Sequence, residues 1–78
     1  MKNYIRIQKS DQRLNTEDIK NILLAGKKIV ANTRQGPEII LAEYEDLNCL
    51  YNAYGKLMKW MELKPSKTFG KHDWEEAS

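Results

Sequence analysis

Residues 25–41, AGKKIVANTRQGPEIIL, decide the predicted fold of this chain. Glycine adopts a left-handed backbone without a Cβ clash, so Gly26 is predicted to close a helix. The β-branched and apolar content on either side of the RQGP turn predicts strands near 28–33 and 38–42. The stretch therefore predicts the end of a helix followed by a hairpin, with Arg34 exposed in its turn.

Outward from this hairpin, the sequence predicts a small α/β (α+β) domain in the order β-α-β-β-α. Residues 4–7 have the composition of a short first strand. Asn15 or Thr16 is the predicted N-cap of a helix that ends at Gly26. The apolar face of that helix consists of Ile19, Ile22 and Leu23.

A second, longer helix is predicted to start near residues 43–46, and it carries the strongest periodic signal in the chain. Its apolar stripe consists of Leu47, Leu50, Tyr51, Tyr54, Leu57, Met58 and Met61. Three short strands are too small to cover the whole stripe, so its C-terminal half is expected to need a partner. After Leu63 the composition turns polar around Pro65, and about the last 14 residues are expected to be mobile when unbound.

Composition argues against several classes of protein. The 78 residues make one small domain, and its single cysteine, Cys49, excludes an intrachain disulfide and a cysteine-cluster metal site. No apolar stretch approaches the roughly 18 residues of a membrane span, and the N-terminus lacks a signal-peptide pattern, so a cytoplasmic location is expected. Catalytic, cofactor and metal-binding motifs are missing, which predicts a non-enzymatic protein with no small-molecule substrate.

The charge of the chain is segregated. Residues 1–36 contain eight Lys/Arg and three Asp/Glu, a net charge of +5, whereas residues 37–62 carry −3. A basic N-terminal half provides the phosphate-neutralising charge that nucleic-acid binding requires. The alternative interpretation is an ordinary solvated surface.

Five short segments carry a resemblance to a known family. They are 13–15 (RLN), 25–28 (AGKK), 33–36 (TRQG), 39–41 (IIL) and 45–50 (EDLNCL). In this order they resemble the Phd/YefM antitoxins of bacterial toxin–antitoxin pairs, also called prevent-host-death proteins. The resemblance covers roughly residues 5–50.

This resemblance implies a homodimeric antitoxin that represses its own operon through operator DNA and neutralises a toxin of the RelE-like or Fic-like class. By this comparison residues 1–53 form the DNA-binding and dimerisation domain, and residues 54–78 form the toxin-binding helix and a disordered tail. The DNA contacts of the family fall on Arg13 and Arg34. Lys9 and Lys27 are further candidates in the basic half.

The expected partner-binding anchors are Leu57, Met58, Trp60, Met61, Phe69 and Trp74. They fit an amphipathic helix that docks into a groove, with the two tail aromatics as a second element. The alternative is that residues 57–61 close the core of the dimer. The rival function is that of a small phage or mobile-element protein that inhibits or adapts one host protein without binding DNA.

Overall fold

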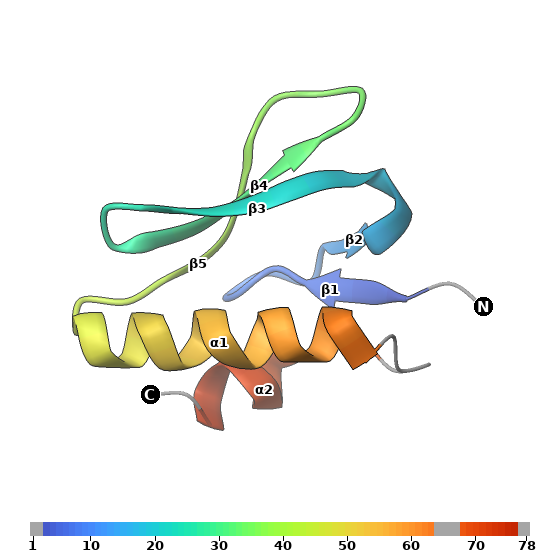
Figure 1. The fold of residues 1–78 in the computed structure, drawn as a ribbon. Helices are drawn as coiled ribbons and strands as arrows, with labels where there is room; N and C mark the ends of the chain where they lie inside the picture. The colour runs from blue at the N-terminus through green and yellow to red at the C-terminus, as the bar shows by residue number, and fades with distance from the viewer. Residues whose placement is uncertain (1–2, 64–67, 77–78) are drawn as a thin grey trace.

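The computed structural model describes residues 3–63 and 68–76, which form two small antiparallel sheets and two helices (Figure 1). The elements in chain order are β1 (Tyr4–Arg6), β2 (Arg13–Asn15), the 3-10 turn η1 (Thr16–Asp18), β3 (Ile19–Ala25), β4 (Lys28–Thr33), β5 (Ile39–Glu43), α1 (Leu47–Leu63) and α2 (Lys71–Glu76). The mixed α+β class predicted from the sequence is confirmed. The predicted polar break at residues 64–67 lies outside the described residues.

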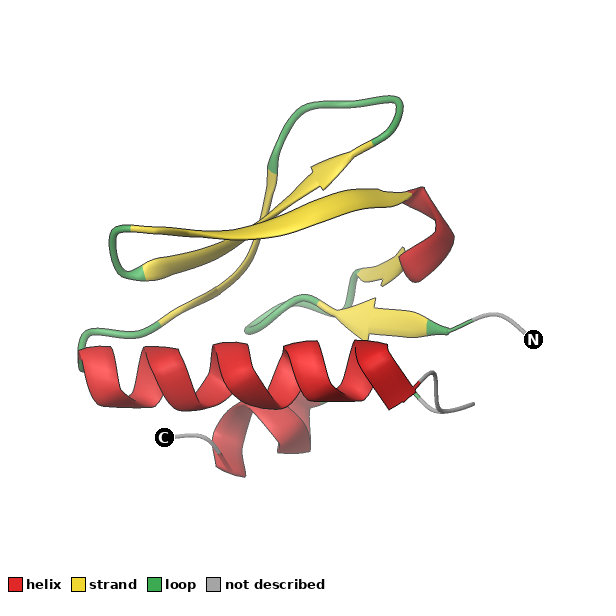
Figure 2. Ribbon diagram, viewed as in Figure 1, coloured by secondary structure: helices red, strands yellow, loops and turns green. Residues whose placement is uncertain are grey.

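The first predicted helix is wrong, because residues 19–25 form strand β3 (Figure 2). The Asn15 side chain does accept a hydrogen bond from the Glu17 N–H at 2.9 Å, as an N-cap does, but it caps only the three-residue turn η1. Gly26 does have a left-handed backbone, with φ 63. It occupies the first central position of the two-residue turn between β3 and β4, where a type II′ hairpin also favours glycine.

A β-bulge explains why β3 resembles a helix in sequence. The pairing of β3 with β4 is irregular between Ile19 and Asn21, so Lys20 is an extra residue. Because the extra residue shifts the alternation of the strand by one, Ile19 and Ile22 both face the core although they are three residues apart. The same spacing is typical of one face of a helix.

The hairpin of β4 and β5 confirms the two predicted strands. The strands pair from Lys28 opposite Glu43 to Ala31 opposite Ile39, with a second irregularity between Ile29 and Val30. This irregularity leaves Leu41 without a register partner, and Leu41 and Ala42 are both buried.

Helix α1 lies across the inner face of the three-stranded sheet (Figure 1). The Asp46 carboxylate accepts a hydrogen bond from the Asn48 N–H at 2.7 Å and fixes the start of the helix. Its buried line consists of Leu50, Ala53 and Leu57. The predicted stripe is therefore rotated, because the small Ala53 faces the sheet and Tyr51 is 55% exposed.

The C-terminal segment is part of the folded core, so the predicted mobile tail is wrong for residues 68–76. Phe69 forms a parallel bridge with Ile5: its N–H donates to the Tyr4 carbonyl at 2.9 Å, and its carbonyl accepts from the Arg6 N–H at 2.8 Å. Helix α2 then places Trp74 against the same strand. The Trp74 indole N–H donates to the Arg6 carbonyl at 2.6 Å.

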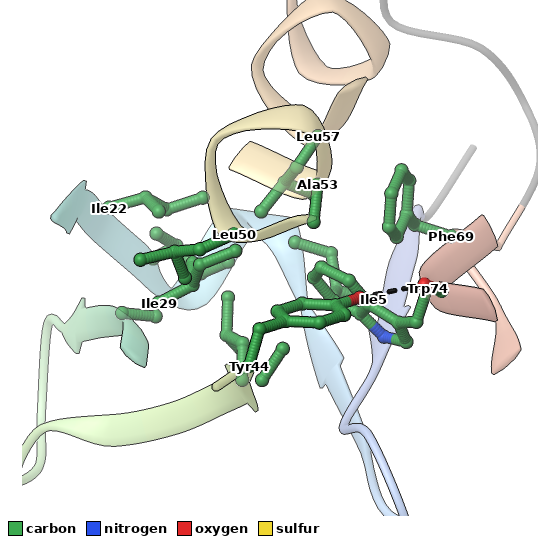
Figure 3. Packing of buried hydrophobic residues seen from close by; sticks show 13 residues of the cluster. Ile5, Ile22, Ile29, Tyr44, Leu50, Ala53, Leu57, Phe69 and Trp74 are labelled. Atoms are coloured by element: carbon green, nitrogen blue, oxygen red, sulfur yellow. Dashed lines mark hydrogen bonds between the residues drawn. The ribbon is translucent and has the colours of Figure 1, made fainter. Parts of the chain in front are cut away.

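Aromatic side chains close the core around Ile5 (Figure 3). The Phe69 and Trp74 rings meet edge to face at 4.6 Å between centroids. The Tyr44 hydroxyl donates to the Trp74 carbonyl at 2.7 Å, which ties the end of β5 to α2. Strand β1, strand β5 and helix α2, which are distant in sequence, are thereby held together.

Candidate binding surfaces

The four predicted DNA-binding residues are all exposed but lie in different segments. Arg34 follows β4, where its N–H donates to the Asp18 carbonyl at 2.8 Å and its Nε donates to the Glu17 carbonyl at 3.1 Å. Arg13 begins β2, the strand that leads directly into η1. These two arginines therefore belong to segments that both adjoin η1.

The two lysines occupy turns elsewhere. Lys27 is the second residue of the β3–β4 turn. Lys9 lies in the turn between β1 and β2 with φ 62, beside a polar pocket that Asp11 and Lys71 also line. The structure therefore does not assemble the four residues into one basic patch.

The predicted partner anchors are mostly core residues. Leu57 is fully buried, Phe69 and Trp74 are each 1% exposed, and Trp60 packs edge to face on Phe69 with centroids 5.6 Å apart. Leu57, Phe69 and Trp74 thus lie in the core of this chain and are not exposed to a partner, while contact of the remaining anchors with a partner stays a prediction. Met61 is half-buried, and Met58 alone of the six is clearly exposed, at 39%.

Exposed apolar side chains are found elsewhere, and two of them, Leu23 and Ile40, lie on the outer face of the sheet, the face turned away from α1. Leu23 lies opposite Val30, and Val30 lies opposite Ile40. Leu23 and Ile40 are 48% and 47% exposed, whereas Val30 between them is 5% exposed and does not belong to the core cluster around the helix. We call Leu23, Val30 and Ile40 the outer strip.

Polar residues border the outer strip on both sides. On one side the Asn32 amide donates to the Asn21 side-chain oxygen at 2.6 Å. On the other side Lys28 lies opposite Glu43 in the register. The sheet thus presents an apolar row with a hydrogen-bonding and charged rim.

The outer strip is not predicted from the sequence, because Ile19, Ile22 and Leu23 have the spacing of one face of a helix. A signal for it is present in the consecutive apolar runs 22–24 and 39–41. In a strand, successive side chains point to opposite faces, so a run of three apolar residues leaves at least one of them outside the core.

A groove of about 550 Å³ lies between β3 and α1. Its lining comprises Ile19, Lys20, Asn21, Ile22, Met58, Met61 and Glu62. The groove runs along the inner side of β3, so this strand has apolar surface on both of its faces.

Two titratable side chains among the described residues, Tyr44 and Glu76, have a clearly shifted pKa. Burial, with a smaller contribution from Cys49, raises the pKa of Tyr44 to about 12, which keeps its hydroxyl a hydrogen-bond donor. Hydrogen bonding to Lys56 and the charge of Lys56 lower the pKa of Glu76 on the surface. Within residues 3–63 and 68–76, no three His, Cys, Asp or Glu side chains gather as metal ligands would.

No helix in the described part of the chain has the length and apolar character to cross a membrane. No protein-family model, curated protein or solved structure matches this chain.

Proposed function

We propose that this chain is a small, non-catalytic cytoplasmic protein that acts by binding another protein through the outer strip. The observation that carries the proposal is the row of Leu23, Val30 and Ile40 with its polar rim. An apolar centre surrounded by polar groups is the usual anatomy of a protein–protein interface.

Of the two functions expected from the sequence, the outer strip favours an inhibitor or adaptor that binds one protein. The segment expected to fold around a toxin already packs on β1, through Phe69 and Trp74. If the chain is an antitoxin of the Phd/YefM kind, its toxin is bound by a preformed surface. Such a surface loses less conformational entropy on binding than a disordered tail does.

Binding to operator DNA is the second candidate. It is favoured by the exposure of Arg13 and Arg34 and by the two hydrogen bonds that hold Arg34 on η1. A guanidinium on a fixed backbone loses little freedom when it meets a phosphate or a base edge.

The protein-binding proposal is tested by replacing Ile40 with Asp and capturing partners from lysate of the source cells. The matched control is Leu47→Asp, because Leu47 is 46% exposed against 47% for Ile40 and lies at the start of α1, away from the outer strip. We expect wild type and Leu47→Asp to capture the same protein, and Ile40→Asp to lose it by about tenfold or more.

Circular dichroism confirms that each variant is folded. Equal capture by all three proteins, or capture of nothing by the wild type, contradicts the proposed function.

A further inference from the structure

The two edges of the three-stranded sheet differ in the hydrogen bonds that they receive from the rest of the described residues. At the β5 edge, the Gln8 N–H donates to the Leu41 carbonyl at 2.8 Å, and the Gln8 side chain accepts from the Glu43 N–H at 2.9 Å. At the β3 edge, no loop or side chain of the described residues hydrogen-bonds to Ile22 or Leu24. One edge is therefore covered and the other is open.

The register shows which backbone groups are open. Ala25 and Lys28 flank the two-residue turn, where a hairpin closes on a hydrogen-bonded pair. Because the bonding direction alternates along a strand, Leu23 and Ala25 bond to β4. The N–H and C=O groups of Ile22 and Leu24 therefore point away from the sheet, along its open edge.

This edge has few of the features that keep edge strands from pairing. Strand β3 is seven residues long and contains no proline, and its one charged residue is Lys20, at the bulge near its start. Leu23 on the outer face and Leu24 on the helix face are 48% and 39% exposed. Long edge strands with apolar side chains pair readily with another strand.

We infer that β3 pairs antiparallel with β3 of a second copy of this chain, about a two-fold axis that passes through Leu23. In an antiparallel pair, the side chains of two opposing residues point to the same face of the sheet. A two-fold axis between two residues would oppose neighbouring residues, whose side chains point to different faces. The axis must therefore pass through a residue. The axis at Leu23 places Ile22 opposite Leu24 of the second copy, and Leu24 opposite its Ile22. These are the residues with open N–H and C=O groups, so both pairs can exchange hydrogen bonds.

Side-chain chemistry favours this register. It places Leu23 opposite Leu23 of the second copy and Asn21 opposite its Ala25, so no charge faces a charge between residues 21 and 25. An axis through Ile22 instead places Leu24 opposite the ammonium-bearing Lys20, where the bulge interrupts the edge.

The pairing also accounts for the apolar surface on both faces of β3. On the helix face, Leu24 of the second copy comes beside Ile22 and covers the groove toward Met58. On the outer face, the two outer strips meet at Leu23 and run without a break across both three-stranded sheets. This inference goes beyond the proposed function, since it concerns the strand edge and not the partner of the outer strip.

Cross-linking of the full-length protein tests the register. In the inferred dimer, residue 23 faces its own copy in a non-hydrogen-bonded pair, where Cα atoms lie about 4.5 Å apart, within the range of a disulfide. Residue 25 instead faces residue 21 of the second copy. Residue 25 of the second copy lies four positions further along the strand, which is about 13 Å at about 3.3 Å per residue. We therefore expect Leu23→Cys to form a disulfide-linked dimer under mild oxidation at least about tenfold faster than Ala25→Cys.

Two controls accompany this measurement. Ala25 is exposed on the same face of the same strand, so it matches Leu23 in access to the oxidant. The wild type, whose single cysteine is the half-buried Cys49, shows how much cross-linking comes from that residue.

Light scattering on the wild type at micromolar concentration is expected to give twice the chain mass. Leu23→Lys, which sets two ammonium groups opposite each other at the axis, is expected to give a monomer with an unchanged circular dichroism spectrum. A monomeric wild type overturns the inference. So does a dimer in which Leu23→Cys links no faster than Ala25→Cys.

The two proposals fail separately. If the wild type is a monomer but still captures a protein in a way that depends on Ile40, only the pairing of β3 is overturned. A Leu23-linked dimer that captures no protein overturns only the proposed function.

Discussion

At the scale of single residues, Gly26 shows how one local signal fits two structures. Its left-handed backbone, with φ 63, is correct for the end of a helix and equally for the first position of a hairpin turn. The sequence therefore predicts the right backbone conformation for Gly26 but the wrong secondary-structure element. Neighbouring residues alone do not distinguish the two, because both structures require the same φ.

Two glycine substitutions test this conformation. Gly26→Ala is expected to lower the free energy of unfolding by about 1–2 kcal/mol, because an L-residue with a Cβ is strained at this φ. Gly55→Ala is the matched control. Gly55 lies inside α1 with no atom within 4 Å of an added Cβ, so this change is expected to stabilise by up to about 1 kcal/mol. Urea denaturation measures both; equal effects would contradict the assigned turn.

The titration of Tyr44 is coupled to folding. Its pKa of about 12 in the folded protein lies above the ordinary value of 10.0. The stabilisation by the neutral hydroxyl is therefore fully present below about pH 10 and is lost as pH rises through about 12. The bond to the Trp74 carbonyl is the interaction that this titration affects.

Replacing Tyr44 with Phe is expected to cost about 0.5–1.5 kcal/mol near neutral pH, because one buried hydrogen bond is lost. The difference from wild type is expected to shrink above about pH 11. Urea denaturation at both pH values measures this. Tyr51→Phe is the control, since Tyr51 is 55% exposed, and a constant difference for Tyr44→Phe across pH would contradict the assignment.

At the scale of elements, the C-terminal segment departs furthest from expectation. Its two aromatics are isolated in a charged sequence, which is typical of a disordered tail. In the structure Phe69 bridges to Ile5, and Trp74 donates to a carbonyl 68 residues away in sequence. Surface ion pairs between Lys56 and the Asp73 and Glu76 carboxylates lie at the border of this contact.

Trp74→Ala is therefore expected to destabilise the protein by about 3–5 kcal/mol, since it empties a fully buried site. A domain of this size has little more stability than that, so most of the population is expected to unfold. Leu63→Ala, at a residue 69% exposed, is the control and is expected to have a small effect. Thermal denaturation measures both, and a cooperative transition unchanged by Trp74→Ala would show that α2 is not part of the core.

At the scale of the whole molecule, the charge segregation does not produce one basic face. Arg13 and Arg34 lie in segments that adjoin η1, whereas Lys9 and Lys27 occupy two other turns. The positive charge gathered at any one place is smaller than the net charge of residues 1–36 suggests, because these four side chains are divided among separate segments.

If the protein binds DNA upstream of its own reading frame, Arg34→Ala is expected to weaken binding. If Arg34 makes a bidentate contact to a base, the loss of binding free energy is about 1–3 kcal/mol. If it contacts a phosphate, the affinity depends less steeply on salt concentration in the variant. Lys59→Ala removes the same charge from the exposed side of α1 and is the control. Fluorescence anisotropy over a salt series measures binding; no binding at low salt removes the DNA candidate.

The sequence by itself determined the features that depend on neighbouring residues. These are the strands predicted near 28–33 and 38–42, the left-handed Gly26 and the long helix predicted to start near residues 43–46. Each is set by local backbone preference or by a periodicity of apolar residues, and such signals act over a few residues. The mixed α+β class follows from them.

Only the tertiary structure decided the rest. Ile19 and Ile22 can both face a core from a helix or from a bulged strand. Residues 19–25 form a strand because β4 supplies their hydrogen-bond partners. Phe69 and Trp74 become buried because β1 and Tyr44 offer them a surface that their own segment lacks. The outer strip and the open edge of β3 exist only once the strands are aligned, since they are made of residues from separate strands brought into register.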